Sequence, residues 1–232
     1  AKLEPAAKLE PAAKLEPAAK LEPAAKPEPA AKLEPAVKLK TAKAPLLEIP
    51  LKHPLEHRWS LWYYKNEKSR NWEDNLVEIS SFDTVEDFWA LYHHVELPSN
   101  LRSGCDYSFF KSDIKPMWED SRNRQGGRWI FNLNKGQGPT INNYWLEVLL
   151  CLIGENFGEF SDDMCGAVVQ IRTKVDRIAV WTADVRHVDG NIKIGRTVKE
   201  SMHLPPRFIV PYHSHADAQS KHGSSTKAKY QV

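Results

Sequence analysis

The sequence predicts an α+β domain: one antiparallel sheet with three helices packed on one of its faces. Short β-rich runs recur between residues 58 and 213, segments with helical spacing lie between them, and most links are short, as hairpins require. No GxGxxG motif follows a predicted strand, which argues against a parallel nucleotide-binding sheet. The sheet face without helices is then free to curve around a ligand.

Residues 1–45 are predicted not to fold. Residues 1–36 consist of six copies of a hexapeptide, AKLEPA with one variant AKPEPA, so every copy holds a proline. The prolines interrupt any helix, and one leucine or none per copy cannot build a core. We therefore expect an extended, disordered tail over 1–45 and a single domain over 46–232.

The domain carries almost no net charge. The tail holds nine Lys and six Glu, which leaves 23 basic and 24 acidic residues in 46–232. Such a domain lacks the basic field that grips long duplexes, so we expect any nucleic-acid contact to be local. The cysteines Cys105, Cys151 and Cys165 form no CxxC pair, and no His stands at zinc spacing. This pattern indicates reduced core thiols and no metal site. No apolar run reaches the ~20 residues of a membrane span.

The first helix is predicted within residues 82–97, after strands at 58–65 and 75–80. Thr84 and Asp87 resemble a capping box, and Pro98 lies just beyond the helix end. Apolar residues recur at intervals of three and four, which marks an amphipathic helix, at Val85, Phe88, Trp89, Tyr92 and Val95.

The later elements follow the same logic. A mostly buried helix is expected over 141–155 and a weaker one over 189–202. Further strands are expected at 106–111, 127–133, 165–174, 177–184 and 207–213. The clearest hairpin joins the strands at 165–174 and 177–184 through Val175-Asp176. Arg172 and Lys174 would then share one strand face, with Arg177 after the turn.

Two tryptophans stand in polar loops and are each followed by Glu-Asp. Trp72 lies in SRNWEDN and Trp118 in IKPMWEDSRNRQGGRW. Two indoles can stack a flat ring between them, and a cationic ring adds a cation–π energy of about 0.5–2 kcal/mol per face. Glu119 adds a carboxylate for neighbouring N–H donors, such as N1–H and the 2-amino group of guanine, which N7 methylation makes cationic. The alternative is that each indole is a half-buried packing residue beside a solvated carboxylate.

Basic residues gather around the predicted hairpin. Arg172, Lys174 and Arg177, with Arg128 after Gly126-Gly127, suit the oxygens of a phosphate. The alternative is that these charges only solubilise a turn.

Eight segments occur in the order of a known family: KHPLEHRWSLWYYKNEKSRNWEDNL, SFDTVEDFWALYHH, DYSFFK, IKPMWED, GGRW, NYWLEVLLCLIGE, CGAVVQIRTK and IAVWTAD. From His53 to Val232 the chain resembles the mRNA cap-binding initiation factor 4E family of eukaryotic translation. The tail lies outside the resemblance. The resemblance implies that the concave face of the curved sheet holds a cap-binding slot, that the helices cover the convex face, and that the C-terminal loop 213–229 is mobile.

The resemblance also implies roles for individual residues. Trp72 and Trp118 would sandwich 7-methylguanine, with Glu119 on N1–H and the 2-amino group and Trp181 at the N7-methyl group. The backbone N–H of Trp118 would reach O6. The residues expected on the triphosphate are Arg128, Arg172, Lys174, Arg177 and Lys221. Many relatives have Lys where this chain has Arg177. No cofactor and no catalytic residue is implied.

A second surface is implied on the helical face. It would take a Tyr-x-x-x-x-Leu-φ helix of scaffold and repressor proteins. The matching residues are His53, Pro54, Val85, Trp89, Leu146 and Glu147. For Trp89 the alternative is a core aromatic of an amphipathic helix. Ser224 matches a regulatory phosphorylation position, where a phosphate adds about −1.5 to −2 charge.

The implied function is binding of the mRNA 5′ cap and recruitment of a scaffold factor, by a monomer within an initiation complex that acts in the cytoplasm, with the nucleus as a second location. One alternative is a cap-binding repressor, or a tissue-specific variant with weakened scaffold binding. Trp72 favours the first reading, because such repressors tend to change the first stacking aromatic. A third reading is an enzyme acting on caps. It would need clustered metal-binding carboxylates, for which Asp162-Asp163 is the nearest candidate.

Overall fold

A computed structural model describes residues 51–67, 71–136, 141–220 and 227–232, which belong to one unit of the fold, residues 49–232. The tail expected over 1–45, Lys221 and Ser224 lie outside the described residues.

The architecture is one eight-stranded sheet in which every neighbouring pair is antiparallel. The strand order is β2-β1-β3-β5-β6-β4-β7-β8. The strands are β1 (Pro54–Tyr64), β2 (Leu76–Thr84), β3 (Asp106–Lys111), β4 (Gly127–Asn134), β5 (Met164–Gln170), β6 (Val175–Thr182), β7 (Pro211–Ser214) and β8 (Tyr230–Gln231). The predicted fold class, a single antiparallel sheet of the α+β type, is confirmed.

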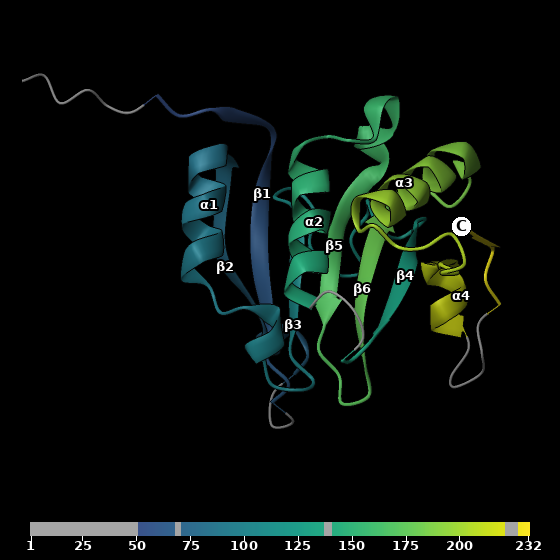
Figure 1. Ribbon diagram of the computed structural model, residues 1–232, viewed down its shortest axis with the longest axis horizontal. Coiled ribbons are helices and arrows are strands. Elements are labelled where there is room, and N and C mark those ends of the chain that lie inside the picture. The colour runs from purple at the N-terminus through teal and green to yellow at the C-terminus, as the bar shows by residue number, and fades with distance from the viewer. Residues whose placement is uncertain (1–50, 68–70, 137–140, 221–226) are drawn as a thin grey trace, which may run out of the picture. The chain divides into compact units, whose positions relative to one another are not determined.

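Three long helices lie side by side across one face of the sheet (Figure 1). They are α1 (Val85–His94), α2 (Ile141–Ile153) and α3 (Val188–Ser201). The cap of α1 agrees with its sequence, because Thr84 Oγ1 accepts the Asp87 N–H at 3.3 Å and donates to the Asp87 carboxylate at 2.7 Å. Three short 3₁₀ helices, η1 (Glu73–Asn75), η2 (Pro98–Asn100) and η3 (Gly158–Asp163), lie in the connections.

The C-terminal part differs from the prediction. The strand predicted at 207–213 is shorter and begins later, because β7 spans only Pro211–Ser214. It is followed by a fourth helix, α4 (His215–Ser220), and by β8. Neither was predicted, because six residues reading HADAQS show no apolar period and a two-residue strand is too short for any periodicity. The segment 213–229, expected to be a mobile loop, thus contains the end of β7 and the whole of α4.

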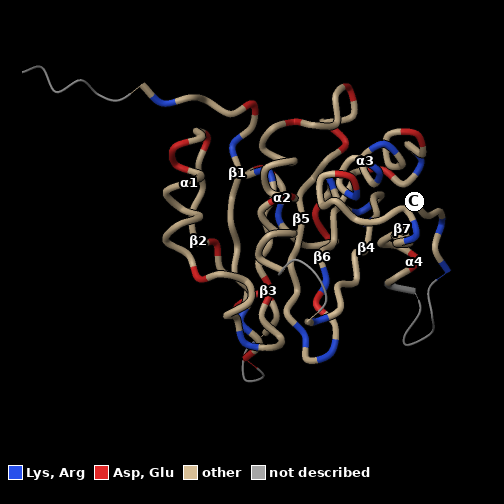
Figure 2. The backbone as a smooth tube through the Cα atoms, viewed as in Figure 1, with Lys and Arg blue, Asp and Glu red and all other residues tan. Residues whose placement is uncertain are grey.

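The β5–β6 hairpin also corrects the prediction. Its turn is 171–174, not Val175-Asp176, since β6 already begins at Val175 and Gln170 pairs with Arg177. The carboxylate of Asp176 accepts the backbone N–H of Arg172 at 3.0 Å, which stabilises this turn. Arg172 and Lys174 therefore lie in the turn and not on one strand face. Figure 2 shows Lys and Arg gathered there.

Two apolar clusters sit on the two faces of the sheet. The larger packs the strands against α1, α2 and α3, and its fully buried centre includes Trp59, Phe131 and Val180. The smaller lies on the other face and contains Phe110, Ile114, Cys165, Val168, Ala179 and Trp181. Because side chains alternate along a strand, Val180 belongs to the first cluster and Trp181 to the second. Within the ranges described, no helix is long and apolar enough to cross a membrane.

Candidate ligand-binding site

A cavity of about 730 Å³ opens on the face that the long helices leave uncovered. Its floor comes from β3, β5 and β6, through Ser108, Val168 and Trp181, and its walls come from two loops that carry Trp72 and Trp118. The lining residues are Tyr64, Asn71, Trp72, Glu73, Leu76, Asp106, Ser108, Pro116, Met117, Trp118, Glu119, Arg128, Val168, Gln170 and Trp181.

The two loop indoles keep their faces accessible. Trp72 is 47% exposed and Trp118 is 40% exposed, whereas Trp59 and Trp129 are completely buried. Trp72 leans on Tyr64, with ring centroids 6.1 Å apart and planes inclined by 32°. The prediction that both indoles serve one site agrees with their position on one cavity. The alternative, that each indole is a half-buried packing residue, shares these exposures, so it is the common cavity and not the exposure that favours one site.

The loop that carries Trp118 is shaped by buried polar groups. Asn123 is completely buried, and its side-chain amide donates to the carbonyls of Lys115 and Met117 at 2.8 Å each. The carboxylate of Asp120 accepts the N–H groups of Lys115 at 3.0 Å and Arg122 at 2.9 Å. These bonds fix the backbone immediately before Trp118, so the indole position does not depend on apolar burial.

The glycine pair after this loop has a steric role. A Cβ atom at Gly127 would lie 2.6 Å from the carbonyl oxygen of His213, and one at Gly126 would collide with that of Thr182. Both positions therefore need the missing side chain, because β4 must approach β6 and β7 closely to enter the sheet.

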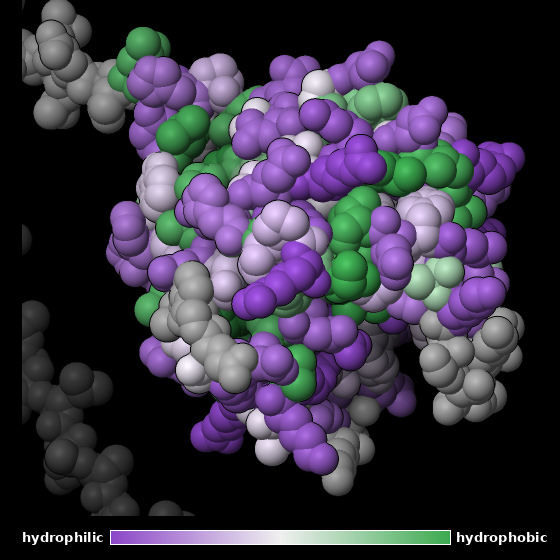
Figure 3. Space-filling view, turned by 45° about the vertical axis from the view of Figure 1, so that its right-hand side comes forward, coloured by the Kyte–Doolittle hydropathy of each residue, from purple (hydrophilic) through white to green (hydrophobic). Residues whose placement is uncertain are grey.

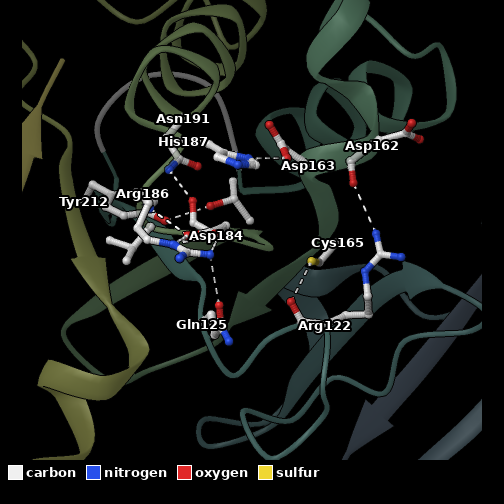
Figure 4. Close-up of polar contacts among 12 residues, drawn as sticks. Arg122, Gln125, Asp162, Asp163, Cys165, Asp184, Arg186, His187, Asn191 and Tyr212 are labelled. Carbon is white, nitrogen blue, oxygen red and sulfur yellow. Dashed lines mark hydrogen bonds and ion pairs between the residues drawn. The ribbon is translucent and has the colours of Figure 1, made fainter.

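A polar network links this loop to the start of α3. His187 Nδ1 is 3.0 Å from the Asp163 carboxylate, and Arg186 donates to Gln125 Oε1 at 3.2 Å and to the Asp184 carboxylate. Figure 4 shows these side chains converging from the loop, η3 and the region before α3. The hydrogen bonds with Arg186 lower the pKa of Asp184 to about 2. Through Gln125, the network anchors the end of the Trp118 loop that leads into β4.

At one end of the cavity floor, the guanidinium group of Arg128 lies over the ring of Trp181. The Trp181 ring packs edge-on against Phe110 with centroids 5.5 Å apart and lies 4.2 Å from the His215 ring. The guanidinium carbon of Arg128 is 5.9 Å from the Trp181 ring centre, within cation–π range. Trp181 and Arg128 are cross-strand neighbours of β6 and β4, so the register itself places the cation beside the indole.

Three arginines concentrate positive charge next to this floor. Burial, and then the charge of Arg177, lowers the pKa of Arg128; burial, and then Arg172, lowers the pKa of Arg177. Arg172 is different, because its hydrogen bonds to the Asp106 carboxylate, one of them 3.0 Å long, raise its pKa. The mutual repulsion of nearby cations favours an anionic ligand at this end of the cavity.

The predicted site residues divide into three groups. Trp72, Trp118, Glu119, Trp181 and Arg128 line the cavity, while Arg172 and Arg177 adjoin it through their charges. Lys174 is exposed in the β5–β6 turn, and no contact places it at the cavity. The indole N–H of Trp118 donates to the Glu119 carboxylate.

Several lining residues were missed. Asp106 and Gln170 meet across β3 and β5, where the Gln170 amide donates to the Asp106 carboxylate at 3.1 Å. Tyr64 was assigned only to a strand. No motif marks these residues, because their place in the site follows from strand pairing rather than from neighbours in the chain.

The second predicted surface lies where β1 begins beside α1 and α2. The carbonyl of His53 accepts the N–H of Val85 at 2.9 Å, and Pro54 pairs with Thr84 across β1 and β2. The carboxylate of Glu86 lies 2.6 Å from the imidazole Nδ1 of His53 and accepts the backbone N–H of His53 at 2.9 Å. These two hydrogen bonds lower the pKa of Glu86 to about 2. These contacts bring the first residues of β1 to the start of α1.

Trp89 is half-buried on α1. Its indole packs edge-on against Phe88 at 5.0 Å and stacks with His93 at 5.6 Å. On α2, Leu146 and Glu147 are both partly exposed. Figure 3, turned so that the α3 and α4 side comes forward, shows a mainly hydrophilic surface interrupted by small apolar groups.

The fold and the cavity define a class of protein: an α+β protein whose single antiparallel sheet carries two loop indoles and an arginine on one ligand-sized cavity. Of the residues described, no three His, Cys, Asp or Glu side chains are grouped to hold a metal ion. The sequence profile described as Eukaryotic initiation factor 4E matches residues 54–230. The chain belongs to the initiation factor 4E family.

Two curated relatives illustrate how similar these sequences are. Eukaryotic translation initiation factor 4E-1A of Danio rerio is 57% identical over 187 residues, which cover 80% of this chain and 87% of the relative. Eukaryotic translation initiation factor 4E of Homo sapiens is 55% identical over 183 residues, or 78% of this chain and 84% of the relative.

Solved structures agree with the fold. The C. elegans eIF4E-3 in complex with the 4E-binding protein Mextli and a cap analog aligns with a TM-score of 0.73 and 42% identity, over 78% of this chain and all of that one. A schistosome eIF4E with m7GpppA and 4E-BP aligns with a TM-score of 0.73 and 32% identity, over 78% and 99% of the two chains.

Proposed function

We propose that this chain binds the 7-methylguanosine 5′ cap of mRNA and recruits a scaffold initiation factor for cap-dependent translation. The observation that carries the proposal is the cavity itself. It combines two exposed indoles, the carboxylate of Glu119 and the guanidinium of Arg128 on one surface. Relatives in this family have been solved with m7G-type caps and with 4E-binding proteins.

The proposed roles follow from the chemistry of each group. Trp72 and Trp118 stack the methylated, cationic base, and Glu119 accepts its N1–H and 2-amino protons while the Trp118 backbone N–H donates to O6. Trp181 contacts the N7-methyl group. The triphosphate is held by Arg128, Arg172 and Arg177, with Lys174 and Lys221 in support.

Titration of intrinsic fluorescence tests this function. We expect 7-methyl-GTP to quench the tryptophans strongly and unmethylated GTP to act far more weakly, since only the methylated base is cationic. Equal weak binding of both nucleotides would contradict the proposal. A protein that retains the fold without the site would behave in that way.

The scaffold surface is the second part of the proposal. A peptide with a Tyr-x-x-x-x-Leu-φ helix docks with its apolar face on the surface formed by His53, Pro54, Val85, Trp89, Leu146 and Glu147. Binding of such a peptide separates an initiation factor from a cap-binding repressor, which keeps the cap site and binds the scaffold poorly. We expect cap and peptide to bind at the same time, because their surfaces lie on opposite faces of the sheet.

Three further features complete the proposal. The protein binds its ligand without chemical conversion and acts as a monomer within an initiation complex. Phosphorylation of Ser224 would add about −1.5 to −2 charge, which would repel an incoming cap or bridge to Lys174.

We propose the cytoplasm as the main location of the protein and the nucleus as a second one. The domain is proposed to span 46–232, with 1–45 as its tail.

A further inference from the structure

Buried polar atoms without partners concentrate around Trp181 and Arg128, two residues that line the cavity. Across the described residues, eight buried side-chain nitrogen or oxygen atoms lack a hydrogen-bond partner. Four of these eight lie in one cluster: Arg128 Nε, Trp181 Nε1, His213 Nδ1 and His215 Nε2. Buried polar groups are normally satisfied, so this cluster leaves hydrogen-bonding capacity unused directly beside two residues that line the cavity, Arg128 and Trp181.

The sheet register explains how the cluster forms. Trp181 of β6 pairs with Arg128 of β4, and Arg128 pairs with His213 of β7. The three side chains therefore form a row across three strands on the cavity face. From α4, His215 covers the Trp181 end of the row with its ring 4.2 Å away. His213 is thus the next side chain beyond the arginine that lines the cavity.

His213 faces mostly cations. Burial, then the charges of Arg128 and Arg177, lower its pKa, and Asp217 of α4 acts weakly in the opposite direction. Asp217 is itself 3.4 Å from the ammonium group of Lys229, which precedes β8. Burial and the neighbouring cations therefore favour the neutral imidazole, and its Nδ1 has no partner among the described residues.

We infer that His213 is a further binding residue for the polyphosphate group: its imidazole takes up a proton from solvent when the polyphosphate docks on Arg128 and Arg177, and the imidazolium then stabilises the bound anion. The inference rests on the proposed function, because it concerns the phosphate end of the same cavity. The ligand brings the negative charge that offsets the two neighbouring guanidinium groups, and protonation becomes favourable.

The sign of the pH effect follows from linkage. Burial and the nearby arginines lower the pKa of His213 in the free protein, and a bound anion would raise it, so binding takes up protons between the two values. Affinity for the polyphosphate ligand rises as the pH falls through the pKa of the complex, and it levels off below the pKa of the free protein. A ligand without phosphates gives no such dependence at this residue.

Calorimetric titration in two buffers of different ionisation enthalpy measures the proton uptake. The proteins are the wild type, His213→Gln and His94→Gln, the last as a control because His94 is an exposed histidine on α1. The ligands are 7-methyl-GTP, unmethylated GTP, 7-methylguanosine and inorganic tripolyphosphate. Any titration of the ligand itself is common to all three proteins and cancels in the comparison.

We expect 7-methyl-GTP to draw more protons into the wild type than into His213→Gln, and 7-methylguanosine to show no difference. The affinity ratio of the two proteins should grow from near one at pH ~8 to about three- to tenfold at pH ~6. Equal proton uptake and a constant ratio would overturn the inference. Failure of the proposed function would look different: 7-methyl-GTP would bind no better than GTP, and tripolyphosphate would still report on His213.

Discussion

On the helical face of the sheet Trp59 and Trp129 are completely buried, whereas on the opposite face Trp72 and Trp118 are 47% and 40% exposed. The buried indoles are held by apolar packing; Trp59, for example, stacks on Phe109 with centroids 4.9 Å apart. The exposed indoles are held by loops, one of which is braced by hydrogen bonds to its own backbone. The difference teaches that one residue type stabilises the fold on one face and remains available to a ligand on the other.

Trp129→Ala should have the largest effect, on stability. The indole is fully buried, donates to the carbonyl of Asn191 at 2.8 Å and packs edge-on against Tyr212 at 5.1 Å. Removing it leaves a large cavity and should lower the free energy of unfolding by about 3–5 kcal/mol. Chemical denaturation measures the loss. An unchanged midpoint would show that the helical face is not the stabilising one.

Trp118→Ala should have the complementary effect, on binding. Loss of one stacking face and its cation–π energy should weaken 7-methyl-GTP binding by about 2–4 kcal/mol, because stacking alone is worth about 1–3 kcal/mol per base. The free energy of unfolding should change by less than about 0.5 kcal/mol, as for other exposed positions. If this variant instead unfolds like Trp129→Ala, the contrast between the two faces is wrong.

Trp89→Ala separates the helical face into core and docking parts. The indole is only half-buried, so we expect a loss of about 2 kcal/mol in binding of the scaffold peptide, as for an interface hot spot. Binding of 7-methyl-GTP should be unchanged. Both affinities are measured on the same preparation. Simultaneous loss of both would argue against two independent surfaces.

Asn123→Ala should have the smallest effect and sharpens the role of the loop. Without its amide the carbonyls of Lys115 and Met117 lose their donor, and we expect affinity for 7-methyl-GTP to fall by about 1–2 kcal/mol as Trp118 loses its position. Asn191→Ala is the matched control. Asn191 is also completely buried, and its amide donates to the backbone carbonyl of Asp184 at 2.8 Å and to the hydroxyl of Tyr230 at 2.9 Å, and neither residue lines the cavity.

Both Asn variants should lose stability, but only Asn123→Ala should lose affinity. The quenching of tryptophan fluorescence by 7-methyl-GTP provides the readout. Equal affinities of the two variants would show that Asn123 stabilises the fold without positioning the indole.

The sequence by itself determined the elements with a clear period and the residues with a motif. The spacing of Val85, Phe88 and Tyr92 defines α1, because a helix returns to the same face every three or four residues. The repeated Trp-Glu-Asp segments singled out Trp72 and Trp118. Tryptophan is normally largely buried, so an indole among charged neighbours in a loop suggests that it binds a ligand. Both indoles line the cavity.

Only the tertiary structure decided which residues from distant segments meet. The β5–β6 turn moved to 171–174 because Asp176 caps it from within β6, and the short α4 and β8 had no period to reveal them. The row of Trp181, Arg128 and His213 comes from β6, β4 and β7, and the pairing of Asp106 with Gln170 comes from β3 and β5. Local periodicity is set by neighbours in the chain, whereas cross-strand register is fixed by the packing of the whole sheet.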